Sequence, residues 1–331
     1  MEFALPTPHE WSYGSRALVT IALASGGLSD SARSVLRASH SLLQQADELN
    51  IDAITPLSPA ELAVAELRPT IRFQLVGAMV VMAMADAEVK PAAADTVTKL
   101  AAALGVETSA TANLTRIAEG HYLRARLDIL RRQWAPKKLR ELAAEEGISV
   151  IPKAVLTILG GSIDPALSAR YIELGKLPSG TLGRGYFDYM IRNELPFPGE
   201  AGSPPEVILF HDMTHILSGY DTTPADEILA ASFSAGYSTY EVHNWLVFVL
   251  SQFQLGLQTA PGVPPATMMM DPQRLLIAVR RGAAMNINLN EGWDYWDVIE
   301  EPIDALRERY NILPESAFEP QSAGKTVVRD L

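Results

Sequence analysis

The sequence predicts an all-α protein built from two helical domains. Residues 12–145 are rich in Ala, Leu and Met, are interrupted by Gly and Pro, and contain almost nothing that resembles a strand. With 331 residues, 48% of them hydrophobic, the chain is long enough to bury a substantial core and to divide into two domains. We place the N-terminal helical domain at residues 1–147, the second domain at 148–313 and a mobile tail at 314–331.

The N-terminal domain is expected to contain helices in succession. Residues 72–85 are apolar on nearly every side, which predicts a central helix buried among the others. Further helices are expected at residues 92–104, 109–131 and 136–145.

The second domain follows a predicted linker at residues 147–165, in which Gly160 and Gly161 interrupt any helix. Residues 196–205, rich in Pro and Gly, then form an exposed loop that leads into a helix beginning near Glu206. A long helix is expected farther on, at residues 239–257.

The most informative segment is the His-Asp-Met-Thr-His stretch at residues 211–215. On an α-helix, His211, Asp212 and His215 lie within one arc of roughly 100°. Imidazole and carboxylate groups are common ligands of divalent cations, so all three side chains are candidate ligands of one ion.

The residues after this helix predict a turn and a second helix. Gly219 suits a helix C-terminus, where a positive φ is needed. Thr223 is a candidate N-cap, Pro224 fits the first helical position, and Asp226 completes a Thr-x-x-Asp capping box.

Glu227 lies on this second helix and is the fourth candidate ligand. If the bend is centred near Asp221, His215 lies six positions before it and Glu227 six positions after it, so the two face each other in an antiparallel hairpin. The sequence therefore predicts a metal-binding helical hairpin in the second domain. The alternative, a chance meeting of two histidines and two acids on a solvated helix, is less favoured.

A zincin-like protease fits this pattern less well. Its His-Glu-x-x-His motif uses the longer Glu as general base, and Asp212 stands in that position here. The ligand types suit Zn, Mn, Fe or Co about equally well.

The pattern His-Asp-x-x-His, eleven residues, then Glu resembles the signature of the ubiquinone-biosynthesis protein four family, whose members are mostly helical and hold a divalent metal. The segment 177–183, followed by a helix that ends in Met190, Arg192 and Asn193, is also similar to the family, although Asn193 here follows Arg192 directly. Downstream, Arg281-Gly282-Ala283 and residues 293–312 resemble its closing region. The resemblance covers about residues 150–313.

This resemblance implies a role in building or modifying a polyprenylated quinone ring, with the metal ligands carried over as His211, Asp212, His215 and Glu227. One family role is removal of the C1 carboxylate of a prenylated hydroxybenzoate-type ring with oxidation of that carbon, which would make the protein an oxidative decarboxylase. The other is a non-catalytic scaffold that binds an isoprenoid lipid and organises the pathway's other proteins. A hard cation with such ligands leaves room for a bidentate ligand such as a hydroxybenzoate, and in the enzyme it would act as a Lewis acid.

The implied partners are a prenylated quinone precursor or another isoprenoid lipid, other quinone-biosynthesis proteins and, through the lipid, the membrane surface. Residues 75–85 and 245–250, the most apolar windows, fall short of the ~20 residues that a spanning helix needs. Residues 1–6 lack the basic start and apolar block of a signal peptide. We expect a cytoplasmic protein with peripheral contact at the inner face of the membrane. A second copy of the chain, forming a homo-oligomer, is a further candidate partner.

A second resemblance concerns about residues 60–145, where Met-Ala-Asp-Ala-Glu-Val at 84–89 and a helix ending in Leu-Gly-Val are similar to tellurite-resistance TerB-like domains. Ala87 stands where Gly is usual between the acids. Asp86 and Glu88 are either metal ligands or, as we favour, parts of a solvated helix end.

Three further residues are candidates for substrate binding. Arg280 and Arg281 could clasp an acidic ring substituent, or form a surface pair. Trp245, with Phe248 and Phe253, could line a prenyl channel, although an ordinary place in the core is the favoured interpretation.

Composition excludes other function classes. The net charge of −12 argues against nucleic-acid binding, which needs clustered Lys and Arg to neutralise phosphates. The absence of cysteine excludes disulfides, thiolate zinc sites, cysteine-ligated iron-sulfur clusters and a thiol nucleophile. Of the remaining histidines, His243 is expected to be a satisfied core residue, and His9, His40 and His121 have no partner at ligand spacing.

Overall fold

The computed structural model describes residues 2–44, 48–133, 137, 163–203, 206–260 and 263–320. Within these residues the regular structure consists of fourteen α-helices and five short 3-10 helices, with no strand. Two isolated β-bridges join Thr181 to Pro302 and Leu255 to Thr267. The predicted all-α fold is confirmed for this part of the chain.

The N-terminal helices surround one apolar helix. They are α1 (Pro8–Ala24), α2 (Asp30–Gln44), α3 (Pro59–Ala63), α4 (Pro69–Ala83), α5 (Pro91–Ala103), α6 (Ser109–Ala118) and α7 (Tyr122–Arg131), with the 3-10 helix η1 (Ile51–Ala53). Val76, Met79 and Val80 of α4 are fully buried, and α1, α5 and α14 pack on this helix. The central buried helix expected from residues 72–85 is therefore present.

The helix predicted at residues 109–131 is wrong as a single element, because the structure contains two helices there. Gly120 has φ +77°, a left-handed conformation that ends a helix and that glycine adopts without steric cost. The chain thus turns between α6 and α7. The helix predicted at 136–145 and most of the predicted linker lie outside the described residues, so the boundary at residue 147 stays a prediction.

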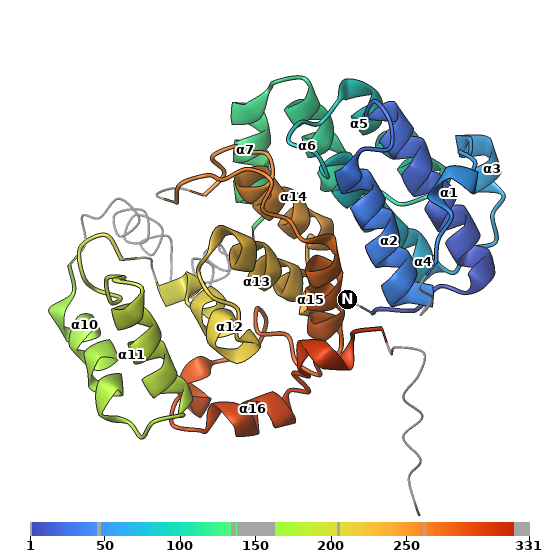
Figure 1. Cartoon of the computed structure of the whole chain (residues 1–331). Helices are drawn as coiled ribbons and strands as arrows, with labels where there is room; N and C mark the ends of the chain where they lie inside the picture. Colours follow the sequence, from blue (N-terminus) through green and yellow to red (C-terminus); the bar gives the residue numbers. More distant parts are fainter. Residues whose placement is uncertain are drawn as a thin grey trace, which may run out of the picture.

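The C-terminal helices are α10 (Pro165–Ile172), α11 (Leu182–Arg192), α12 (Phe210–Ser218), α13 (Pro224–Tyr237), α14 (Val242–Phe253), α15 (Pro272–Ala283) and α16 (Ile303–Arg309). Four 3-10 helices accompany them: η2 (Glu173–Lys176), η3 (Glu206–Ile208), η4 (Tyr295–Val298) and η5 (Glu315–Ala317). Helices α13 to α15 lie between the N-terminal helices and the group formed by α10, α11, α12 and α16 (Figure 1).

Two buried apolar clusters follow from this arrangement. The first joins the N-terminal helices to α14 and to parts of α13 and α15. The second joins α11, α12 and α16 to the other side of α13. Helix α13 contributes Ile228 and Ala235 to the first cluster and Leu229 and Phe233 to the second, so both clusters hold it in place.

Helices α13 and α15 approach each other through two glycines. A Cβ on Gly282 would lie 1.9 Å from the Phe233 carbonyl oxygen, and a Cβ on Gly236 would lie 2.3 Å from the Val279 carbonyl oxygen. Both distances are far inside van der Waals contact, so any other residue would force the helices apart. Among the described helices, none is long and apolar enough to cross a membrane.

Candidate metal centre

Helices α12 and α13 form the hairpin that the sequence predicts. Gly219 ends α12 with φ +81°, and its N–H donates to the His215 carbonyl. The Thr223 side chain accepts from the Asp226 N–H at the start of α13, and Pro224 occupies the first turn. The Asp226 carboxylate accepts from the Thr223 hydroxyl instead of completing the capping box on the backbone.

The hairpin brings His211, His215 and Glu227 together. Their ligand atoms all lie within 4.8 Å of one another. Nε2 of His215 lies 3.1 Å from Nε2 of His211. Glu227 contacts both rings, with Oε2 3.4 Å from His211 Nε2 and Oε1 3.6 Å from His215 Nε2.

These separations fit a divalent cation. Two ligand atoms about 2.0–2.2 Å from a tetrahedrally coordinated ion lie roughly 3.4 Å apart. The observed separations of 3.1 to 3.6 Å bracket that value. Two imidazoles and one carboxylate also form a donor set that Zn, Mn, Fe and Co accept.

The surroundings of His215 prepare its Nε2 as a ligand. The ring is fully buried, and Nδ1 donates to the Tyr220 carbonyl oxygen at 3.1 Å. A proton on Nδ1 leaves Nε2 with a free lone pair that faces His211 and Glu227. The Tyr189 ring stacks on the imidazole with a centroid distance of 5.8 Å.

The site is closed on the His215 side and open on the His211 side, because the His211 side chain is 33% exposed and that of Glu227 is 21% exposed. Burial raises the pKa of Glu227, but contacts with the two imidazoles outweigh this effect and hold that pKa below its ordinary range. Burial lowers the pKa of His211, yet Glu227 raises it overall. The carboxylate therefore stays ionised, as a metal ligand must.

Asp212, the fourth predicted ligand, is not part of this group of three. The ligand atoms that lie within 4.8 Å of one another come from His211, His215 and Glu227 and do not include a carboxylate oxygen of Asp212. Burial raises the pKa of Asp212 to about 6. After burial, its charge is the next cause that raises the pKa of Tyr186 and of Tyr189, both on α11.

Arg281, predicted to bind substrate, is buried against the end of α12. Its Nη2 donates to the Ser218 carbonyl at 3.0 Å and its Nε to the Leu313 carbonyl at 2.8 Å. The guanidinium also lies 5.0 Å from the centre of the Tyr220 ring. Arg281 thus positions the turn whose Tyr220 carbonyl holds His215.

Arg280 and Trp245, the other substrate-binding candidates, both pack against other parts of the protein. Arg280 donates to the Leu42 carbonyl at 3.0 Å, and its guanidinium lies 5.2 Å from the centre of the Phe318 ring. Trp245 is 7% exposed within the first apolar cluster, which matches an ordinary place in the core.

The other sequence candidates have local partners. Asp86 accepts from the Ser29 hydroxyl at 3.0 Å, and Glu88 pairs with Lys90 at 2.5 Å. His243 is buried, and its Nε2 lies 3.0 Å from the Phe73 carbonyl oxygen. Across the described ranges, none of these residues joins a group of three metal ligands.

Two groups near the metal ligands cannot be identified from the sequence. The Tyr220 carbonyl orients His215, but a backbone atom has no sequence signature. Tyr186 is fully buried, and its hydroxyl has no hydrogen-bond partner among the described residues. Its position in the segment between 177 and 193 was apparent, but its burial was not.

No protein-family model matches the sequence, and no curated protein is significantly similar to it. The resemblance to the ubiquinone-biosynthesis protein four family therefore remains a prediction from the motif and its flanking segments.

Proposed function

We propose that the protein is a metal-dependent enzyme that acts on the carboxylated ring of a prenylated hydroxybenzoate-type intermediate. It would remove the C1 carboxylate as CO2, with oxidation of that carbon by an external oxidant such as dioxygen. The observation that carries this proposal is the open group of three ligands. Structural zinc sites use four protein ligands, whereas catalytic sites use three and leave a position for water or substrate. His211, His215 and Glu227 supply three protein ligands. Because the His211 side chain is partly exposed, water or substrate can reach the remaining coordination position.

The donor set supports this chemistry. A divalent ion at this site would stabilise negative charge as a Lewis acid while the ring carboxylate departs. The chain's own residues position the ligands of that ion. The Tyr220 carbonyl fixes the His215 ring, and Arg281 packs on the Tyr220 ring and so fixes the turn that contains Tyr220.

The proposed setting follows from the substrate. A prenylated precursor resides in a membrane, so we propose a cytoplasmic protein that works at the inner membrane face with other quinone-biosynthesis proteins. Zn, Mn, Fe and Co are all compatible with the ligands, and elemental analysis of purified protein would identify the ion.

The test uses cells that lack the parent gene and depend on this protein for quinone synthesis. We expect His211→Ala and Glu227→Ala to abolish quinone production, measured by chromatography of extracted lipids. His121→Ala is the control, because His121 is exposed and lies outside the ligand group. Full quinone levels with both ligand variants would overturn the catalytic proposal.

A scaffold role is the second candidate, favoured by the complete burial of His215 inside the hairpin. In that case the ion would only join α12 to α13. Chelation would then lower the melting temperature, while the purified protein would not convert a carboxylated ring substrate. Turnover of that substrate by purified protein alone would exclude the scaffold role as the whole function.

A further inference from the structure

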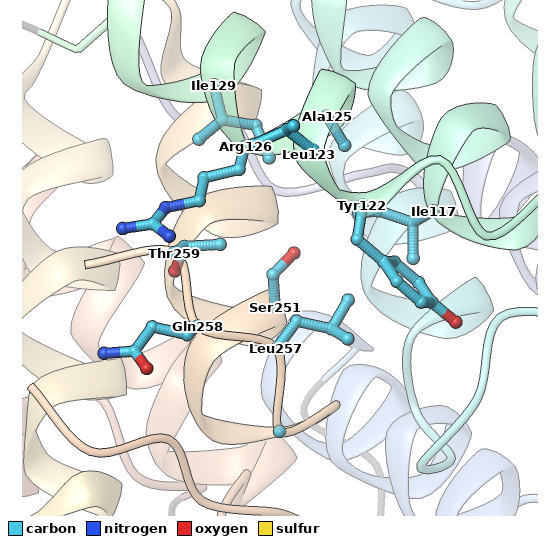
Figure 2. Close-up of a pocket in the computed structure, with 11 residues that line it drawn as sticks. Ile117, Tyr122, Leu123, Ala125, Arg126, Ile129, Ser251, Leu257, Gln258 and Thr259 are labelled. Carbon is cyan, nitrogen blue, oxygen red and sulfur yellow. The ribbon is translucent and has the colours of Figure 1, made fainter. Parts of the chain in front are cut away.

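A cavity lies away from the metal ligands, between α6 and α7 of the N-terminal helices and the end of α14. It encloses about 330 Å³, and Figure 2 shows the residues that line it. Helix α7 forms one wall, and α14 with residues 256–259 forms the other. Its volume lies at the lower end of the range of about 300–1,000 Å³ that small-ligand sites occupy.

Most of the lining is apolar. Ile117, Ala125, Ile129 and Leu257 contribute aliphatic side chains to the interior. Leu123 also lines the cavity although it is 69% exposed, so apolar surface continues from the interior to solvent. Such a lining favours a ligand with a hydrocarbon or aromatic body.

Ser251 gives the interior an unused polar group. It is fully buried on α14, and its Oγ has no hydrogen-bond partner among the described residues. Figure 2 shows this hydroxyl directed toward α7. A buried hydroxyl without a partner costs free energy, which a ligand that accepts its hydrogen bond would recover.

Arg126 provides a charge at the same cavity. It is half-buried on α7 and reaches toward the segment that carries Gln258 and Thr259 (Figure 2). No hydrogen bond or ion pair of its guanidinium is found within the described part of the chain, whereas Arg131 and Arg132, farther along, both bind Asp128.

The polar neighbours of Arg126 are already engaged. The Thr259 hydroxyl donates to the Phe248 carbonyl at 3.1 Å, and the Gln258 amide donates to the Val263 carbonyl at 3.2 Å. Neither presents a carboxylate to the guanidinium. A carboxylate that pairs with Arg126 would therefore come from outside these neighbours.

We propose that this cavity is a binding site for a small amphipathic carboxylate, such as a medium-chain fatty acid. The carboxylate accepts hydrogen bonds from the Arg126 guanidinium and the Ser251 hydroxyl, and the hydrocarbon chain lies against Ala125, Ile129 and Leu257. Charge-assisted bonds to guanidinium are the strong ones for a carboxylate. The site shares no residue with the metal group, so it is independent of the proposed function.

The experiment measures octanoate binding to the full-length protein by isothermal titration calorimetry. Octan-1-ol and octylammonium serve as probes with the same chain and a neutral or positive head. We expect octanoate to bind at least tenfold more tightly than octan-1-ol, because only the carboxylate pairs with Arg126. Octylammonium should show no binding. Equal affinity for octanoate and octan-1-ol, or no octanoate binding at millimolar concentration, would overturn the proposal.

Three variants locate the site. Arg126→Gln should weaken octanoate binding about tenfold or more, since bonds to charged groups are the larger contributors. Ser251→Ala should weaken it severalfold without lowering the melting temperature, because it removes a hydroxyl that has no partner. Arg124→Gln is the matched control on the exposed face of α7, and it should bind like the parent.

Equal losses in Arg126→Gln and Arg124→Gln would show only general attraction to basic residues and would refute this site. Parent-like octanoate binding by both Arg126→Gln and Ser251→Ala would refute it as well. The melting temperature of each variant, measured without ligand, shows whether it is folded as the parent is.

Discussion

Two regions of the molecule each bury a histidine, and only one of them is a candidate metal site. In the α12–α13 hairpin, His215 donates from Nδ1 to the Tyr220 carbonyl, and its Nε2 faces His211 and Glu227. Where α4 crosses α14, His243 contacts the Phe73 carbonyl with Nε2, and its ring stacks on Phe73 at 4.2 Å. No carboxylate faces His243 among its described contacts.

Burial alone does not make a histidine a ligand. Both rings have one nitrogen on a backbone carbonyl, so the partners of the rest of the ring decide its role. A second helix supplies Glu227 to His215, whereas His243 meets Phe73 and Gly77 of α4. Burial accordingly lowers the pKa of His243 to about 4.

The largest expected effect concerns the placement of α13, the helix that carries Glu227. Gly282→Ala should destabilise the protein by about 3 kcal/mol or more, because the new Cβ collides with the backbone of α13. Gly14→Ala is the matched control in α1, where a Cβ meets only a Leu75 methyl at 3.7 Å. It should be neutral or stabilising by up to about 1 kcal/mol. Urea unfolding measures both, and equal stabilities would contradict the glycine contact.

The second prediction concerns His243 and pH. Its pKa is about 4 in the folded protein against an ordinary 6.5, so the unfolded chain binds a proton first as the pH falls. The stability from the neutral ring is present above pH 6.5 and declines between about pH 6.5 and 4. From pH 7 to pH 5 this group should cost about 2 kcal/mol of unfolding free energy.

Chemical denaturation of the parent and of His243→Gln at the two pH values isolates this contribution. The variant cannot take up the proton, so its stability should fall by about 2 kcal/mol less than that of the parent over this interval. Parallel declines would show that His243 titrates alike in both states.

The smallest effect concerns Arg281, which acts on the metal group through Tyr220. Arg281→Lys should lower divalent-metal affinity about tenfold, because loss of such outer contacts commonly costs 10- to 100-fold. Arg280→Lys, on the same helix but bound to Leu42 and Phe318, should leave the affinity unchanged. Competition with a coloured chelator measures both values. An unchanged affinity in Arg281→Lys would remove this residue from the support of the site.

The parts of the fold that depend on local signals were predictable. Gly219 and Thr223 mark the turn within a few residues of sequence, so the hairpin and the facing of His215 and Glu227 followed from spacing. The break at Gly120 does not follow from the sequence, because a single glycine within a helical pattern can also continue the helix.

Long-range contacts account for what the sequence did not predict. Helix geometry gives only the direction of the Asp212 side chain, whereas the group of three ligands also depends on how α13 packs against α12. Arg281 meets Ser218 across 63 positions of sequence, a pairing that no local pattern specifies. One of the two interpretations of Arg280 and Arg281 is a surface pair, whereas in the structure the two side chains are held by different segments.

Metal stoichiometry of the purified full-length protein shows whether the α12–α13 hairpin binds one divalent ion. After chelation and reloading with Zn²⁺ or Mn²⁺, elemental analysis should find one ion per chain in the parent and in His243→Gln. Glu227→Ala should retain almost none, because it removes the only carboxylate in the ligand group. A full equivalent in Glu227→Ala, or none in the parent, would refute a metal centre formed by His211, His215 and Glu227.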